Sequence, residues 1–148
     1  MIRFGIVVFD GFDELDVVGP WEVLRSAAKF GAPFETVLFS FEGARTFEAS
    51  HGLRVVVEAE DPSSFDWIVV PGGGWVSRNT RSAWAEIQRG ELTAALRALR
   101  ATGKSMASDL ALWLTERLAS AEISLKVAQN MEHQRVGRVH RGARSGRS

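Results

Sequence analysis

The sequence of 148 residues predicts a single α/β domain in which a mostly parallel sheet carries helices on both faces. Three observations lead to this prediction. Short, nearly continuous apolar runs indicate strands that are buried on both sides. These runs alternate along the chain with segments of helical periodicity. One run, residues 66–70, passes directly into Pro71 and three glycines, as expected where a buried strand ends in a turn.

The composition excludes several classes of protein. Equal numbers of basic and acidic residues give a net charge of zero, so nothing attracts the whole chain to nucleic acid or to an anionic membrane. The absence of cysteine removes disulfides, thiolate metal ligands and a cysteine nucleophile. No apolar run approaches the ~20 residues of a membrane-spanning helix, and the N-terminus lacks the pattern of a signal peptide. We therefore expect a cytoplasmic protein with no membrane or nucleic-acid partner.

The first predicted strand covers residues 2–9, which are rich in β-branched and aromatic side chains. Asp10 and Asp13 follow it and are interpreted as turn residues. A helix is then expected to begin near Pro20, because a proline in the first helical turn loses no hydrogen bond. The Gly-Ala-Pro sequence at residues 31–33 ends this helix.

The middle of the chain predicts more strands and a second helix. Residues 34–41 alternate in polarity and indicate a strand. Residues 46–48 and 53–57 indicate a short antiparallel hairpin around the turn at residues 50–52. After the strand that ends in glycines, residues 82–100 predict one amphipathic helix, because their apolar side chains repeat at three and four residues.

The last part of the chain departs from this alternation. Residues 104–108 have the pattern of the start of a strand, but a short one. Two helices are then expected, one at residues 110–118 with Asp109 as its cap and one at residues 121–132 with Ser120 as its cap.

Two features follow predicted strands and could carry chemistry. Gly72, Gly73 and Gly74 lack side chains, so their backbone N–H groups could approach a ligand and form an anion or oxyanion cradle. A plain tight turn after a core strand explains these glycines equally well. Asp16 lies in an apolar setting after the first strand and could act as a general acid or base. Spacing alone favours a simpler role for Asp16, that of an acidic residue leading into a helix.

Other motifs are weak. Residues 98–105 (ALRATGKS) match the second half of a phosphate-binding loop, but a helix precedes them where the motif requires a strand. Residues 103–107 (GKSMA) imitate a nucleophile elbow, which should also follow a strand, so a solvated turn is the favoured interpretation. Residues 72–77 form an incomplete dinucleotide fingerprint without an acidic partner for the ribose. The three histidines lack metal-ligand spacing, so neither a metal nor a cofactor is expected.

The chain resembles a known family in two stretches, IVVFDGFDELDVVGPWEVL near its start and DWIVVPGGG farther on. Both are similar to the ThiJ/PfpI superfamily of class I glutamine-amidotransferase-like domains, in its isonitrile-hydratase-like branch. The resemblance implies a flavodoxin-like three-layer sandwich. It also implies hydration of an isonitrile to an N-substituted formamide by a cysteine nucleophile. In this resemblance Asp16 is the acidic residue that bonds the nucleophile, and Gly72 and Gly73 belong to the loop that supplies an oxyanion-hole N–H.

The resemblance runs from residue 2 to residue 108 and then jumps. In the family, a strand such as GKSMAS continues into the turn that bears the cysteine, whereas here Leu110 stands at that place. The segment that follows resembles the family's C-terminal helices. We therefore expect residues 1–134 to form a family domain that is truncated internally near residues 108–109. The basic tail at residues 135–148 is expected to be disordered and solvated.

Three hypotheses of function follow. The leading one is a family member that is inactive by the thiol route, because the nucleophile is absent. The alternative is a non-catalytic small-molecule-binding or regulatory module, similar to the domain that precedes a DNA-binding domain in related regulators. A weak hydrolase using Ser105 or Ser108 is the third. A small-molecule ligand and a homodimer are the expected partners, since the shortened domain must cover apolar surface.

Overall fold

The computed structural model describes residues 1–73, 80–103, 105–107, 115 and 117–130. Within them, four parallel strands form one sheet in the order β2-β1-β5-β6. The strands are β1 (Ile2–Val7), β2 (Phe34–Phe39), β5 (Trp67–Val69) and β6 (Ser105–Ala107). Strand β1 lies centrally and the chain order reverses beside it, as in flavodoxin-like sheets. The predicted parallel α/β architecture is therefore confirmed.

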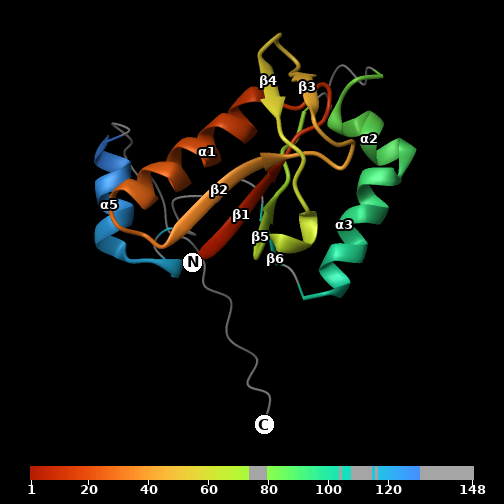
Figure 1. Ribbon diagram of the computed structural model, residues 1–148. Helices are drawn as coiled ribbons and strands as arrows, with labels where there is room; N and C mark the ends of the chain where they lie inside the picture. The colour runs from red at the N-terminus through yellow and green to blue at the C-terminus, as the bar shows by residue number, and fades with distance from the viewer. Residues whose placement is uncertain (74–79, 104, 108–114, 116, 131–148) are drawn as a thin grey trace.

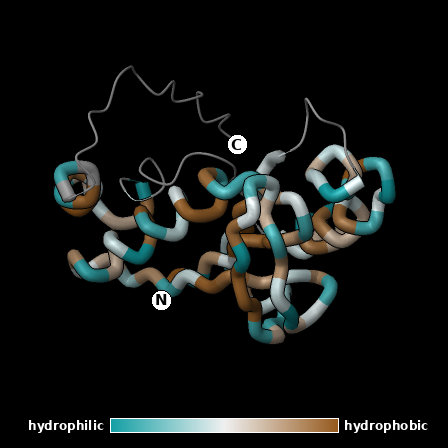
Figure 2. The backbone as a smooth tube through the Cα atoms, turned by 90° about the horizontal axis from the view of Figure 1, so that it is seen from above, coloured by the Kyte–Doolittle hydropathy of each residue, from teal (hydrophilic) through white to brown (hydrophobic). Residues whose placement is uncertain are grey.

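Helices cover both faces of the sheet (Figure 1). One face carries α1 (Glu14–Lys29) and α5 (Ala121–Asn130), and the other carries α2 (Ala83–Arg89) and α3 (Glu91–Ala101). The predicted antiparallel hairpin is present as β3 (Arg45–Glu48) and β4 (Arg54–Val57), and a 3-10 turn, η1 (Pro62–Ser64), precedes β5. Figure 2 shows hydrophobic stretches along the central strands, between the two layers of helices. None of the helices in the described part is both long and apolar enough to cross a membrane.

Helix α1 begins six residues before Pro20, so the expected start is wrong. Asp13 is the N-cap, and its side chain accepts a hydrogen bond from the N–H of Leu15 at 3.0 Å. The acidic side chains of Glu14 and Asp16 then lie in the first turn, where the helix dipole favours negative charge. Pro20 is buried inside the helix. Cap and dipole together outweigh the tendency of proline to mark a helix start, and they place Asp16 on the helix.

The layer of α1 and α5 rests on one hydrophobic cluster. Phe4 of β1 is fully buried and meets Phe34 of β2 edge to face, with ring centroids 5.0 Å apart. Val127 of α5 is also fully buried and belongs to the same cluster. The predicted cap of α5 is confirmed, because the hydroxyl of Ser120 accepts the N–H of Ile123 at 3.1 Å. Residues 131 and 132 of the predicted helix lie outside the described residues.

On the opposite face, the single helix expected at residues 82–100 is two helices. Gly90 separates them with a φ of 80°, a left-handed conformation that ends α2. Because of this break, Ile87 is 47% exposed instead of facing the core. Helix α3 keeps the predicted apolar face. Its packed residues and their partners in the sheet region are Leu92, Leu96, Leu99, Val7, Phe39, Phe65 and Ile68.

Strand β6 extends the short pattern seen in the sequence into a paired strand, with Ser105 opposite Trp67. Ser105 therefore lies in a strand and not in a solvated turn. Residues 98–105 pass from helix through turn to strand, the reverse of a phosphate-binding loop. Ser108, Asp109, Leu110, most of the predicted helix at residues 110–118 and the basic tail lie outside the described residues.

Docking of α5 can be tested with one buried and one exposed residue of that helix. We expect Val127→Ala to lower the free energy of unfolding by about 2 kcal/mol, because it removes two buried carbon atoms and leaves a cavity. The matched control is Leu125→Ala, at a side chain that is 56% exposed, with an expected loss of no more than about 0.5 kcal/mol. Urea denaturation measures both. Equal losses in the two variants would contradict the packing of α5 on the domain.

Candidate functional site

The candidate site lies at the carboxyl ends of β1 and β5, where the strand order reverses and ligands bind in open α/β sheets. Two backbone hydrogen bonds join the loops that leave these strands. The N–H of Asp13 donates to the carbonyl of Gly72 at 3.0 Å. The N–H of Gly72 donates to Oδ2 of Asp16 at 2.8 Å. The structure therefore brings together Asp16, Gly72 and the adjacent Gly73, which the sequence analysis had singled out; Gly74 lies outside the described residues.

Three backbone segments meet so closely here that two glycines are needed. Gly73 has a φ of 135°, and a Cβ at this position would lie 2.8 Å from the carbonyl oxygen of Gly11. Gly11 has a φ of 80°, and a Cβ there would lie 1.8 Å from the carbonyl oxygen of Arg81. Both glycines thus combine a left-handed backbone with a contact that leaves no room for a side chain. The loop after β1 is fixed between the end of β5 and the segment before α2.

The backbone N–H groups of Gly72 and Gly73 differ in their hydrogen bonding. The N–H of Gly72 is directed at the Asp16 carboxylate, so it satisfies that charge. The N–H of Gly73 has no hydrogen-bond partner within the described residues. Oδ1 of Asp16 likewise makes no hydrogen bond in that part of the chain. The arrangement can therefore offer one acceptor, on Asp16, and one donor, on Gly73, to a bound group.

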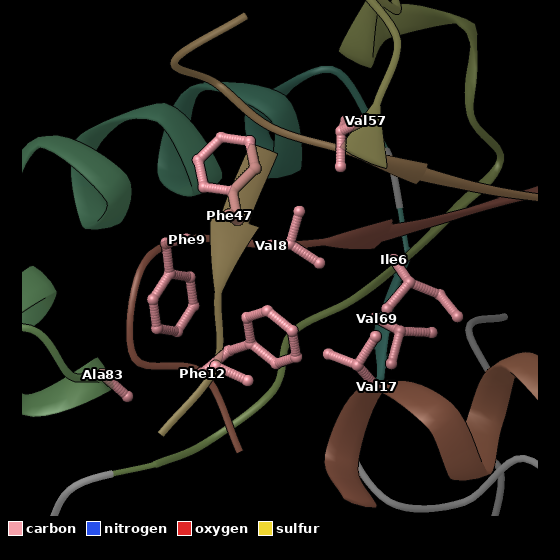
Figure 3. Close-up of a cluster of buried hydrophobic side chains, with 10 residues drawn as sticks. Ile6, Val8, Phe9, Phe12, Val17, Phe47, Val57, Val69 and Ala83 are labelled. Atoms are coloured by element: carbon pink, nitrogen blue, oxygen red, sulfur yellow. The ribbon is translucent and has the colours of Figure 1, made fainter. Parts of the chain in front are cut away.

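A buried hydrophobic cluster includes residues that adjoin the site in the sequence (Figure 3). Val17, which follows Asp16, is buried against Val69 of β5 in this cluster, and Phe12 of the loop is fully buried there too. The hairpin joins the same loop by backbone bonds. The N–H of Gly11 donates to Glu48 at 2.8 Å, and the N–H of Ser50 donates to Phe12 at 2.9 Å. Burial and backbone pairing therefore hold Asp16 in place.

Asp10 has a larger role than the turn residue expected from the sequence. Its Oδ1 accepts the N–H of Glu48 at 3.0 Å and pairs with Arg81 at 3.2 Å, and its Oδ2 pairs with Arg45 at 3.2 Å. Burial alone would raise the pKa of Asp10, but the Glu48 N–H and the two guanidinium groups outweigh it and lower that pKa. Asp10 thus ties the loop to the hairpin and to the segment before α2. Local pattern gives no signal of this, because all three partners are distant in sequence.

Ser50, His51 and Glu14 come within hydrogen-bonding distance, yet they do not form a catalytic triad. Nδ1 of His51 lies 2.8 Å from the Glu14 carboxylate and 3.1 Å from the Ser50 hydroxyl. A triad needs the acid and the nucleophile on different imidazole nitrogens, so that one orients the ring while the other passes the proton. Here both use Nδ1, and the His51 side chain is 78% exposed. These residues join α1 to the hairpin turn, and we call them the His51–Glu14 clasp.

The charges of the clasp reinforce each other. Burial would raise the pKa of Glu14, but hydrogen bonds from His51, its backbone and Ser50 lower it to about 2. The Glu14 carboxylate in turn raises the pKa of His51 above its ordinary value of 6.5. No group of three or more His, Asp or Glu side chains in the described part of the chain could hold a metal ion.

The need for glycine at position 73 can be tested against a glycine of similar backbone but open surroundings. Gly43 has a φ of 86° and no atom within 4 Å of an added Cβ. We expect Gly43→Ala to cost about 1 kcal/mol of unfolding free energy, from backbone strain alone. We expect Gly73→Ala to cost about 3 kcal/mol or more, because a steric clash adds to the strain. Chemical denaturation measures the unfolding free energy of both variants. Equal losses would contradict the close approach of Gly73 to the loop after β1.

The clasp predicts a pH-dependent contribution to stability. The His51 contribution is complete below pH 6.5 and is lost as the pH rises through its raised folded pKa. The Glu14 contribution is complete above pH 4.5 and is lost as the pH falls toward about 2. We therefore expect His51→Ala to lower the melting temperature more at about pH 5.5 than at about pH 8.5. The same change at both values would show that the charge of His51 contributes nothing.

Comparisons with known proteins agree with this geometry at the level of the fold. The chain is similar to an AraC family transcriptional regulator from Pseudomonas putida, with a TM-score of 0.70 and 17% identity over 88% of this chain and 99% of that one. It is similar to DJ-1beta from Drosophila melanogaster, with a TM-score of 0.59 and 15% identity over 90% and 99%. A ThiJ/PfpI family protein from Pseudomonas syringae is also similar, with a TM-score of 0.61 and 14% identity over 96% of this chain and 79% of that one. The predicted flavodoxin-like fold is confirmed.

Comparison of the sequence with known families and proteins identifies the family as well as the fold. The chain is 36% identical over 73 residues to an uncharacterized protein in the cpoL 5′ region of Streptomyces lividans, covering 48% of this chain and 51% of that protein. It therefore spans about half the length of this curated relative. The model of the DJ-1/PfpI family matches residues 3–104, which include Asp16, Gly72 and Gly73. This match covers well over half of the sequence, and the chain belongs to the DJ-1/PfpI family.

Proposed function

We propose that this protein is a DJ-1/PfpI-family member of isonitrile-hydratase-like descent that does not use the family's thiol route and instead binds a small neutral molecule beside Asp16. One observation carries the proposal. The Asp16 carboxylate is held at 2.8 Å by the N–H of Gly72, in a chain without cysteine. This bond supports the proposal that Asp16 and the glycine loop are the surroundings of a reacting group, and the sequence contains no cysteine to serve as that group.

The chemistry explains why the thiol matters. Hydration of an isonitrile to a formamide adds a nucleophile to the isonitrile carbon and a proton to the resulting anion. Asp16 could handle the proton, and the N–H of Gly73 could stabilise developing negative charge. Neither group adds to carbon. A site stripped of its nucleophile keeps only the residual acceleration that binding and electrostatics provide.

The same two groups suit a bound amide. Oδ1 of Asp16, which accepts no hydrogen bond from the described residues, matches an amide N–H, and the N–H of Gly73 matches an amide carbonyl. A binding role also agrees with the fold likeness to a transcriptional regulator. We therefore infer a small-molecule-binding or regulatory module that takes a ligand with one hydrogen-bond donor beside one acceptor.

Two assays with the purified chain test this function together. We expect no hydration of cyclohexyl isocyanide and no turnover of methylglyoxal above the rate in buffer, because no thiolate is present. We expect N-cyclohexylformamide to raise the melting temperature in a saturable way. Asp16→Ala should abolish that rise. The matched control Glu22→Ala removes an exposed carboxylate farther along α1 and should leave the rise unchanged.

Each half of the proposal can fail by itself. Turnover of either substrate that disappears in Asp16→Ala would contradict the non-catalytic claim. A formamide effect that is absent, or that survives in Asp16→Ala, would contradict the binding claim.

A further inference from the structure

A pocket lies beside the loop that follows β1, and Asp16 does not line it. Its volume is about 400 Å³, within the range of small-molecule sites. It lies between the carboxyl ends of β1 and β2, the start of the hairpin and the adjoining ends of α2 and α3. Neither Asp16 nor Gly72 nor Gly73 lines it. Whatever binds here therefore does not depend on the function proposed above.

One wall of this pocket is apolar. Val7 of β1 is buried, and Phe41 and Leu92 pack on the same hydrophobic cluster while lining the pocket. These three side chains come from the central strand, from the chain after β2 and from α3. A ligand in the pocket would lay an aliphatic or aromatic body against them and remove apolar surface from water.

The rest of the lining is charged, and most of its charges already have partners. Arg45 pairs with Glu42 and with Asp10, and its guanidinium also lies over the ring of Phe47. Arg89 pairs with the largely buried carboxylate of Glu86, one helical turn away. Neighbouring carboxylates therefore already engage the guanidinium groups of Arg45 and Arg89.

Two lining charges differ from the others. Arg81 is 58% exposed, and its one ion pair with a described residue is to Asp10 at 3.2 Å. Asp10 would stay satisfied without it, because Arg45 and the N–H of Glu48 also bond its carboxylate. Glu91 is exposed in the first turn of α3 and has no ion-pair partner among the residues that the structure describes. The pocket thus offers a guanidinium that can turn to a new anion and a carboxylate that lacks a cation.

We propose that this pocket binds a small amphipathic zwitterion of the α-amino-acid class, with its carboxylate on Arg81, its ammonium on Glu91 and its apolar side chain against Val7, Phe41 and Leu92. The charge balance of the lining selects this class. Four carboxylates face three guanidinium groups, so a dianion such as phosphate meets a surplus of negative charge. A simple amine leaves Arg81 unused, and a simple carboxylate leaves Glu91 unused.

Calorimetric titration with leucine tests the proposal, with two half-ligands as controls. Leucine should bind in the millimolar range and saturate. 4-Methylpentanoate lacks the ammonium group and 3-methylbutylamine lacks the carboxylate, so each should bind about tenfold more weakly. Arg81→Gln and Glu91→Gln should each lower the affinity for leucine by a similar factor, about tenfold. Thermal melts of the ligand-free variants check that both still fold.

Two further variants locate the binding. Arg97→Gln changes an exposed arginine of α3 outside the pocket, and Asp16→Asn changes the site of the proposed function; both should leave leucine affinity unchanged. Absence of saturable leucine binding would overturn the proposal. So would an affinity that neither Arg81→Gln nor Glu91→Gln alters, or one that only Asp16→Asn reduces. Because the formamide effect should depend on Asp16 and leucine binding on Arg81 and Glu91, either proposal can fail while the other stands.

Discussion

The hydrogen bond from Gly72 N–H to the Asp16 carboxylate is the interaction on which the site depends. It joins the first turn of α1 to the end of β5 across the point where the strand order reverses. The reciprocal bond from Asp13 to Gly72 doubles this connection. With both bonds made, Gly73 is held against the backbone of Gly11, at a distance that excludes any side chain. Hydrogen bonds and close backbone contacts therefore join the start of α1, the glycine loop and the loop after β1 to one another.

Two regions of different chemistry adjoin these loops, the site at Asp16 and the charged pocket at Asp10. On the side of α1, the Asp16 carboxylate and the amides of Gly72 and Gly73 lie close in the chain to members of a buried hydrophobic cluster that includes Phe12 and Val17. On the side of α3, Asp10 collects a backbone amide and two arginines at the rim of a charged pocket. The first region places a single carboxylate beside backbone amides. The second is lined mainly by long charged side chains that form ion pairs.

Features with a local cause could be predicted from the sequence, and features with a distant cause could not. Buried strands appear as apolar runs, and the glycines after β5 mark the site edge, because a buried strand and a tight turn leave direct signatures. The start of α1 was missed because the cap and the burial of Pro20 outweigh a local proline signal. The break at Gly90 was missed because apolar periodicity continues across it. The sequence predicts only a turn residue at Asp10, because the partners of its carboxylate are distant in sequence and meet it only in the folded chain.

Amide hydrogen exchange measures most directly whether the N–H of Gly72 is bonded to the Asp16 carboxylate. We expect slow exchange at Gly72 in the native protein. In Asp16→Ala we expect a large acceleration at Gly72 with the amides of β1 unchanged, since the sheet itself does not depend on this bond. Fast exchange at Gly72 in the unaltered protein, or protection that persists without the carboxylate, would show that this bond does not hold the site together.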